Sequence, residues 1–266
     1  MQRAVFVLTP SESKRLIAKG VRRLPEVEHA LERGKVIIAG GTTNAFVAEE
    51  IAGVKIQKER YTAGIITDGR LCVTPSEERI APIVLVKGEV VDAAWEDVLD
   101  DFGPDDVFIK GANAIDASGL AGVLVSSPTG GTIGRALGIV AGRGSHLVIP
   151  VGLEKMIPSV RDAARSCGNR LFDYSLGSPV GMIPLAYGKI VTELVALEVL
   201  FGVEAVAIGA GGVGGSEGSI AIAISGDGER VKSAVDLIKA IKGEPPVVGL
   251  RQKCAGCSQK CTYVKS

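Results

Sequence analysis

The sequence is poor in aromatic residues and has no excess of charge of one sign. Phe, Trp and Tyr make up 4% of the 266 residues, and 30 Lys and Arg balance 30 Asp and Glu. With few aromatic side chains, there is little on which bases could stack, and a chain without net charge has no overall field that attracts a polyanion. We therefore expect no nucleic-acid partner.

Long apolar runs are also missing, although 46% of the residues are hydrophobic. No segment approaches the roughly 20 apolar residues that a membrane-spanning helix needs. The apolar stretch near the N-terminus is too short for a signal peptide. The sequence therefore predicts a cytoplasmic protein with a sizeable core and no membrane partner.

The cysteines are odd in number, at five, and unevenly placed. Without an export signal, this favours reduced thiols over a disulfide framework. Cys254, Cys257 and Cys261 stand close together, and short loops bring thiolates together without long-range folding. They form a candidate site for zinc or an iron–sulfur centre, which usually take four ligands; the alternative is a tail of exposed thiols. A residue of a second subunit or one of three residues of this chain would complete the set: Cys72, Cys167 or His29.

The strongest indication of a ligand site is a strand that runs into two glycines and then opens a helix. Residues 36–38 form a β-branched apolar run, and Thr42 or Thr43 is placed to cap the helix that follows. Unpaired N–H groups and the positive end of the helix dipole would converge there on a phosphate or carboxylate. The alternative is a tight turn without a ligand. The candidate ligand-binding residues are Gly40, Gly41, Thr42, Thr43 and Asn44.

A second group of polar residues follows the apolar strand predicted at residues 107–109. Lys110 could pair with a phosphate or carry a proton, and Asp116 could act as a base or bind sugar hydroxyls. Asn113 could fix a hydroxyl or a carbonyl, with Gly111 beside it. The alternative is a surface loop that uses these residues for its own turns.

A third feature is another glycine-rich entry into a helix. Gly130 and Gly131 precede Thr132, which is placed to cap a helix over residues 133–140. A second anion-binding loop that faces the first would suit a phosphorylated or CoA-type ligand. The glycines at residues 209–214 instead lead into alternating residues, so they predict a hairpin and no dinucleotide site.

The order of predicted elements indicates an α/β protein with two folded units. Residues 1–178 alternate strands and helices, which is typical of a mostly parallel, Rossmann-like sheet with helices on both faces. Residues 179–250 follow the order βαββαβ, which predicts a ferredoxin-like domain with strands at 182–186, 203–208, 220–224 and 247–250. Residues 251–266 form the cysteine-containing tail.

The glycine–threonine helix entry and the run at residues 110–116 resemble the superfamily of ribose-5-phosphate isomerase A, glucosamine-6-phosphate deaminase and the CoA transferases, with LUD-type proteins as relatives. The later strand that leads to Lys155 is similar as well. The resemblance implies a small phosphorylated or CoA-type metabolite and an isomerase or transferase activity. Lys110 and Asn113 replace aspartates of the isomerase motif, so Asp116 or Glu154 would have to supply the carboxylate.

These observations lead to one functional hypothesis and its alternatives. Residues 40–44 would hold the anion, Lys110 and Asp116 would be catalytic, and Lys155 would add a second positive contact. A metabolite sensor that uses the same pocket without chemistry is an alternative, as is a metal or iron–sulfur protein. Because ferredoxin-like modules assemble readily, we also expect a homo-oligomer.

Overall fold

The structure is a computed structural model that describes residues 1–255, 257 and 261–263 of the chain. The helices are α1 (Pro10–Arg22), α2 (Pro25–Arg33), α3 (Thr42–Ala52), α4 (Trp95–Leu99), α5 (Gly131–Arg143), α6 (Val160–Arg165), α7 (Glu193–Phe201) and α8 (Gly228–Ile241), with short 3-10 turns η1 (Lys58–Arg60), η2 (Ser76–Glu78) and η3 (Leu153–Lys155). The strands are β1 (Gln2–Leu8), β2 (Lys35–Ile38), β3 (Gly64–Thr67), β4 (Arg70–Val73), β5 (Ile83–Val86), β6 (Glu89–Val91), β7 (Val107–Ile109), β8 (Ala114–Ile115), β9 (Ala121–Val125), β10 (His146–Pro150), β11 (Gly181–Leu185), β12 (Lys189–Val191), β13 (Glu204–Gly211) and β14 (Ser219–Gly226). The protein is therefore α/β, as predicted.

A mixed sheet, here called the central sheet, forms the middle of the molecule, in the order β12-β10-β7-β2-β5-β6. The strands β12, β10, β7 and β2 run parallel. β5 is antiparallel to both of its neighbours. The carboxyl ends of the four parallel strands thus meet at one edge, called the carboxyl edge below, where open α/β sheets bind ligands.

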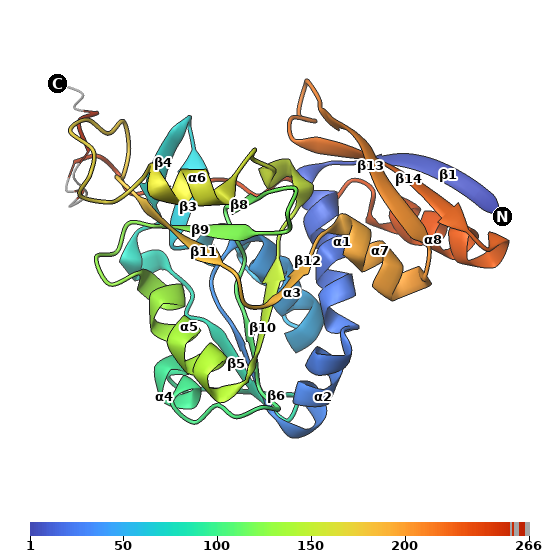
Figure 1. The fold of residues 1–266 in the computed structure, drawn as a ribbon, viewed down its shortest axis with the longest axis horizontal. Coiled ribbons are helices and arrows are strands. Elements are labelled where there is room, and N and C mark those ends of the chain that lie inside the picture. Colours follow the sequence, from blue (N-terminus) through green and yellow to red (C-terminus); the bar gives the residue numbers. More distant parts are fainter. Residues whose placement is uncertain (256, 258–260, 264–266) are drawn as a thin grey trace.

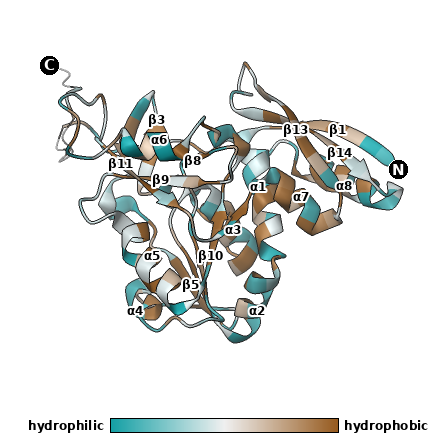
Figure 2. Cartoon of the chain, viewed as in Figure 1, coloured by the Kyte–Doolittle hydropathy of each residue, from teal (hydrophilic) through white to brown (hydrophobic). Residues whose placement is uncertain are grey.

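Both faces of the central sheet are covered, because its strands are apolar on both sides (Figures 1 and 2). Val36 and Ile38 of β2 join a buried cluster with α1, α2 and α3 on one face. Ile37, which points the other way, joins a second cluster with α4, α5 and β9 on the opposite face. This alternation explains why the short apolar run at residues 36–38 forms a central strand.

A second, outer sheet has the order β1-β14-β13 (Figure 1). The hairpin predicted around residues 209–214 is confirmed, since β13 runs to Gly211 and returns antiparallel as β14. The third strand comes from the N-terminus, with Leu8 opposite Ile220. A two-stranded hairpin alone has marginal stability, and β1 adds a third strand. Ala4, Phe6 and Leu8, which alternate along β1, pack against the core.

The remaining strands predicted within residues 179–250 do not join the outer sheet. β11 pairs with β9 in a small sheet with β8, and α7 begins at Glu193, after β12 has joined the central sheet. The Thr192 side chain accepts a hydrogen bond from Val195 N, which fixes this start. Residues 247–250 form no strand. Strand pairs β1–β14, β9–β11 and β10–β12 link the parts before and after residue 178.

Candidate functional site

The loop after β2 enters α3 without a side-chain cap. Gly41 is the N-cap, and Thr42 and Thr43 are already helical, so the expectation that a threonine caps the helix is wrong. Gly41 N donates to Tyr61 O at 2.7 Å. Within the described residues no hydrogen bond is formed by the backbone N–H groups of Thr42, Thr43 and Asn44, the donors that an anion takes at a helix start.

Asn44 joins this helix start to the neighbouring strand. Its side chain is fully buried, and Nδ2 donates to Ala39 O at 2.7 Å and to Ile109 O at 3.1 Å. Oδ1 has no hydrogen-bond partner in the described part of the chain and lies beside Gly111, where a Cβ would be 3.5 Å away from it. The ends of β2 and β7 are therefore locked together, with an unused acceptor between them.

Lys110 and Lys155 lie at the same edge, and neither is within ion-pair distance of a carboxylate of the described residues. Lys110 Nζ donates to Gly111 O at 3.1 Å, and Lys155 Nζ donates to Ala112 O at 2.9 Å. Burial and repulsion by the Lys155 ammonium lower the pKa of Lys110 to about 8. The structure thus brings the two predicted lysines together and leaves their charges available.

Two carboxylates stand next to the lysines. Glu154 Oε1 pairs with Lys14 Nζ at 3.0 Å, whereas the buried Oε2 has no partner among the described residues. Glu193 is fully buried and accepts from Leu153 N with both oxygens, at 3.2 and 3.0 Å. Gly152 is wedged between the carboxylates, since an added Cβ would collide with Glu154 Oε2 and lie 3.1 Å from Glu193 Oε1.

The environments of these carboxylates move their pKa values apart. Burial and the negative charge of Glu154 raise the pKa of Glu193 to about 6. Burial acts on Glu154 in the same direction, but the Lys14 and Lys155 ammonium groups outweigh it and lower the pKa of that carboxyl. Such a split pair is typical of sites that move protons. Sequence reasoning missed Glu193, because a glutamate in a first helical turn is an ordinary surface feature.

Asp116 and Asn113 are occupied by structural bonds. Asp116 accepts from Ser118, Leu120 and, at 2.9 Å, from Val160 N, and the hydrogen bond from Ser118 leads those that lower its pKa to about 2. The exposed Asn113 accepts from Leu124 N at 3.0 Å. A carboxylate with that pKa is a weak base at neutral pH.

The second glycine-rich helix entry, at Gly130 and Gly131, lies on the other side of the central sheet. α5 packs in the cluster that contains Ile37, whereas α3 packs in the opposite cluster. Gly130, with φ of +81°, is the N-cap, so the expected Thr132 cap is wrong. No hydrogen bond in the described residues joins this loop to α3 or Lys110. The two glycine-rich loops therefore do not face each other on one side of the sheet.

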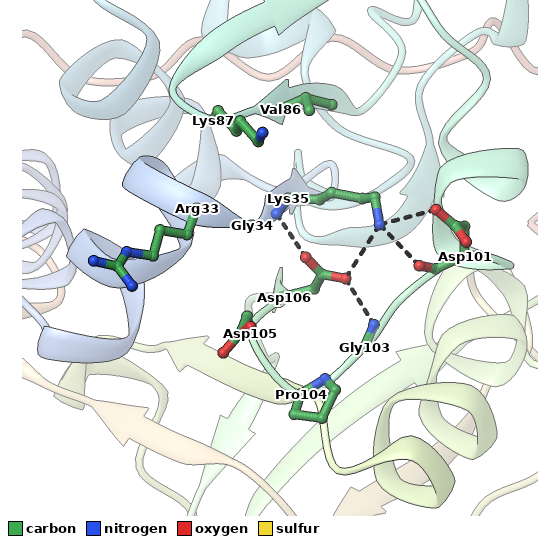
Figure 3. Close-up of a pocket in the computed structure, with 10 residues that line it drawn as sticks. All are labelled: Arg33, Gly34, Lys35, Val86, Lys87, Asp101, Gly103, Pro104, Asp105 and Asp106. Carbon is green, nitrogen blue, oxygen red and sulfur yellow. Dashed lines mark hydrogen bonds and ion pairs between the residues drawn. The ribbon is translucent and has the colours of Figure 1, made fainter.

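A pocket of about 300 Å³ lies at the opposite, amino edge of the central sheet (Figure 3). Three of its charged residues are paired with one another: Lys35 Nζ lies 2.9 Å from Asp101 Oδ2 and 3.5 Å from Asp106 Oδ2. Asp106 also accepts from Lys35 N at 2.6 Å and Gly103 N at 2.7 Å. These bonds tie the starts of β2 and β7 to each other, and we assign the pocket no ligand.

Four cysteines line a further pocket: Cys72, Cys254, Cys257 and Cys261. Two other predicted candidates lie outside it, since Cys167 is not among the lining residues and His29 pairs with Asp105 at 3.0 Å near the amino edge. Within residues 1–255, 257 and 261–263, no three His, Cys, Asp or Glu side chains are close enough to hold one metal ion. In the same residues no helix is long and apolar enough to span a bilayer.

Comparison with known proteins gives no assignment. No protein-family model matches the chain, and no curated protein is significantly similar to it in sequence.

Proposed function

We propose that the carboxyl edge binds a small phosphorylated or CoA-type metabolite and acts on it as an isomerase. One observation carries the proposal: Lys110 and Lys155 lie together at this edge, and neither has an ion-pair partner among the described residues, although Glu154 and Glu193 attract the Lys155 ammonium from farther away. An anionic ligand would supply the direct partner that both ammonium groups lack. The open first turn of α3 adds N–H donors beside them.

The roles follow from charge and bonding. The metabolite's anionic group would lie at the α3 N-terminus with Lys155. Lys110, whose pKa is near 8, would take a proton from a carbon next to a carbonyl as the amine and return it to the neighbouring carbon as the ammonium. The unpartnered Glu154 Oε2 would accept a substrate hydroxyl. We give this carboxylate role to Glu154 and not to Asp116, because Asp116 already has four hydrogen bonds.

The arrangement of strands and helices supports the proposed Rossmann-like and ferredoxin-like units. We infer a Rossmann-like unit from the parallel strands β12, β10, β7 and β2 with helices on both faces. The outer sheet, with α7 and α8 packed against it, would correspond to a ferredoxin-like unit in which β1 contributes a strand.

A proton-exchange experiment tests the activity. Sugar phosphates and CoA thioesters are incubated with the protein in deuterated water, and their spectra are followed by proton NMR. We expect deuterium to enter one substrate next to its carbonyl group, and Lys110→Ala to abolish this exchange without unfolding the protein. Lys55→Ala, at an exposed lysine, is the matched control. Deuterium exchange that persists in Lys110→Ala would show that Lys110 does not transfer the proton.

Calorimetry tests the anion site independently of chemistry. A bound anion stabilises the Lys110 ammonium, so binding near pH 8 should take up a proton and affinity should fall as the pH rises above about 8. Titrations in two buffers with different ionisation enthalpies measure this uptake. Binding without uptake, or equal uptake by Lys110→Ala, would contradict the assignment.

A second candidate is a non-catalytic sensor that responds by changing its association state. The outer face of the β1-β14-β13 sheet favours it, because apolar side chains stand exposed there: Val5 at 67%, Val7 at 48%, Val206 at 52% and Ile208 at 58%. Such a face fits a second copy of the chain. A bound ligand returned unchanged, together with a ligand-dependent mass in light scattering, would select the sensor over the enzyme.

A further inference from the structure

The cysteine pocket is separate from the residues proposed above and is built from three segments of the chain. Cys72 lies on β4, and the C-terminal segment brings the other three cysteines. Ser178 N and Gln252 N donate to carbonyls of β4 at 2.7 and 2.9 Å, and Thr262 N donates to Ser175 O at 2.8 Å. The Gln252 bond joins the C-terminal segment to β4, and the other two bonds join β4 and the C-terminal segment to residues 175–178. The sequence left the fourth ligand open among Cys72, Cys167, His29 and a residue of a second subunit, and of the three in this chain Cys72 lines the pocket.

One sulfur atom is held by backbone donors. Cys261 Sγ accepts from Gly177 N at 3.2 Å and from Tyr263 N at 3.4 Å. Gly177 has a φ of +131°, and a Cβ there would lie 2.5 Å from Leu71 O, so only glycine lets this segment approach β4 and aim its N–H at the sulfur. N–H donors to sulfur stabilise thiolates and tune iron–sulfur centres.

Positive charge adjoins the pocket. The Arg70 guanidinium lies 3.7 Å from the centre of the Tyr263 ring, and both residues line the pocket. The Arg70 guanidinium thus places a cation beside the cysteines, where it can balance thiolate charge.

The space that the four cysteines line favours a cluster over a single ion. A zinc ion holds four sulfurs at about 2.3 Å each, which needs a tight tetrahedron. In the described residues no three ligating side chains are close enough to hold one metal ion, and the four cysteines line, together with eight other residues, a space of about 300 Å³. A polynuclear cluster spreads its thiolate ligands farther apart than one ion does. We propose that Cys72, Cys254, Cys257 and Cys261 ligate an iron–sulfur cluster.

The test uses the full chain purified without oxygen and reconstituted with ferric iron, a thiol reductant and sulfide. We expect equal amounts of bound iron and acid-labile sulfide, with sulfur-to-iron charge-transfer absorption in the visible region. Cys72→Ser should lower the iron and sulfide contents by more than half, whereas Cys167→Ser, outside the pocket, should keep them. Cys257→Ser, in a segment without regular structure, provides the same test if Cys72→Ser fails to fold.

Several results would overturn the proposal. Wild-type iron and sulfide in Cys72→Ser would exclude Cys72 as a ligand. One zinc per chain, without sulfide and lost in the same variants, would replace the cluster with a single-ion site. Wild-type protein that is folded by its unfolding transition but retains no iron or sulfide would show that the cysteines bind no cluster.

Discussion

Replacing Glu193 by glutamine should stabilise the protein. The Glu193 carboxylate is fully buried, and its pKa rises from the usual 4.5 to about 6. Each pKa unit corresponds to 1.36 kcal/mol, so the ionised carboxylate costs the folded state about 2 kcal/mol at pH 7. Glutamine carries no charge, and its oxygen can still accept from Leu153 N. We therefore expect Glu193→Gln to raise the free energy of unfolding at pH 7 by about 2 kcal/mol.

The sign of the pH dependence follows from where each state releases its proton. The unfolded chain releases it near pH 4.5 and the folded chain near pH 6, so the wild-type free energy of unfolding falls between these values as the pH rises. Glu193→Gln lacks this fall. The difference between the proteins should be close to zero near pH 4.5 and reach its full value above pH 6.

Urea unfolding followed by fluorescence measures this difference. Trp95, the only tryptophan, packs 6.2 Å from Phe108 between ring centres and reports on the core. Glu154→Gln is the control of opposite sign, because it removes the ion pair with Lys14 and should lower the free energy of unfolding by about 1–3 kcal/mol. A Glu193→Gln protein less stable than wild type at pH 7, or an effect equal at pH 5 and pH 7, would contradict a free-energy cost of the buried charge.

Three further predictions concern parts of the fold that surround the site. Tyr61→Phe leaves Ile38 O without its hydroxyl donor and Ile83 N without its acceptor, and should lower the free energy of unfolding by about 1–3 kcal/mol in urea titrations; no change would contradict the buried bonds. Asp116→Asn removes a charge-assisted acceptor and should lower the melting temperature at pH 7, by an amount that shrinks as the pH falls toward 2. Ile208→Lys should keep the wild-type melting temperature and shift light-scattering mass to the monomer, and a wild-type mass would exclude this face as the interface.

Local sequence patterns predicted a strand correctly where its formation depends on the residues of that segment alone. The apolar run at residues 36–38 predicted β2, and the alternation at residues 220–224 predicted a strand after the glycines, because side-chain period is a local property. Caps were less predictable. Thr42 and Thr132 are good caps by residue type, but Gly41 and Gly130 take that position in the structure. Gly41 N is bonded to Tyr61 O, a contact that sequence spacing cannot reveal.

By itself, the sequence determined the α/β class, the strand–glycine–helix entry at the carboxyl edge, and the presence there of Lys110 and Lys155. Only the tertiary structure decided which groups surround them. It placed Glu154 beside the buried Glu193, occupied Asp116 with loop hydrogen bonds, sent β1 to the outer sheet, and brought Cys72 to the tail cysteines. The physical reason is that pairing partners, burial and the fields between charges depend on residues far apart in the chain.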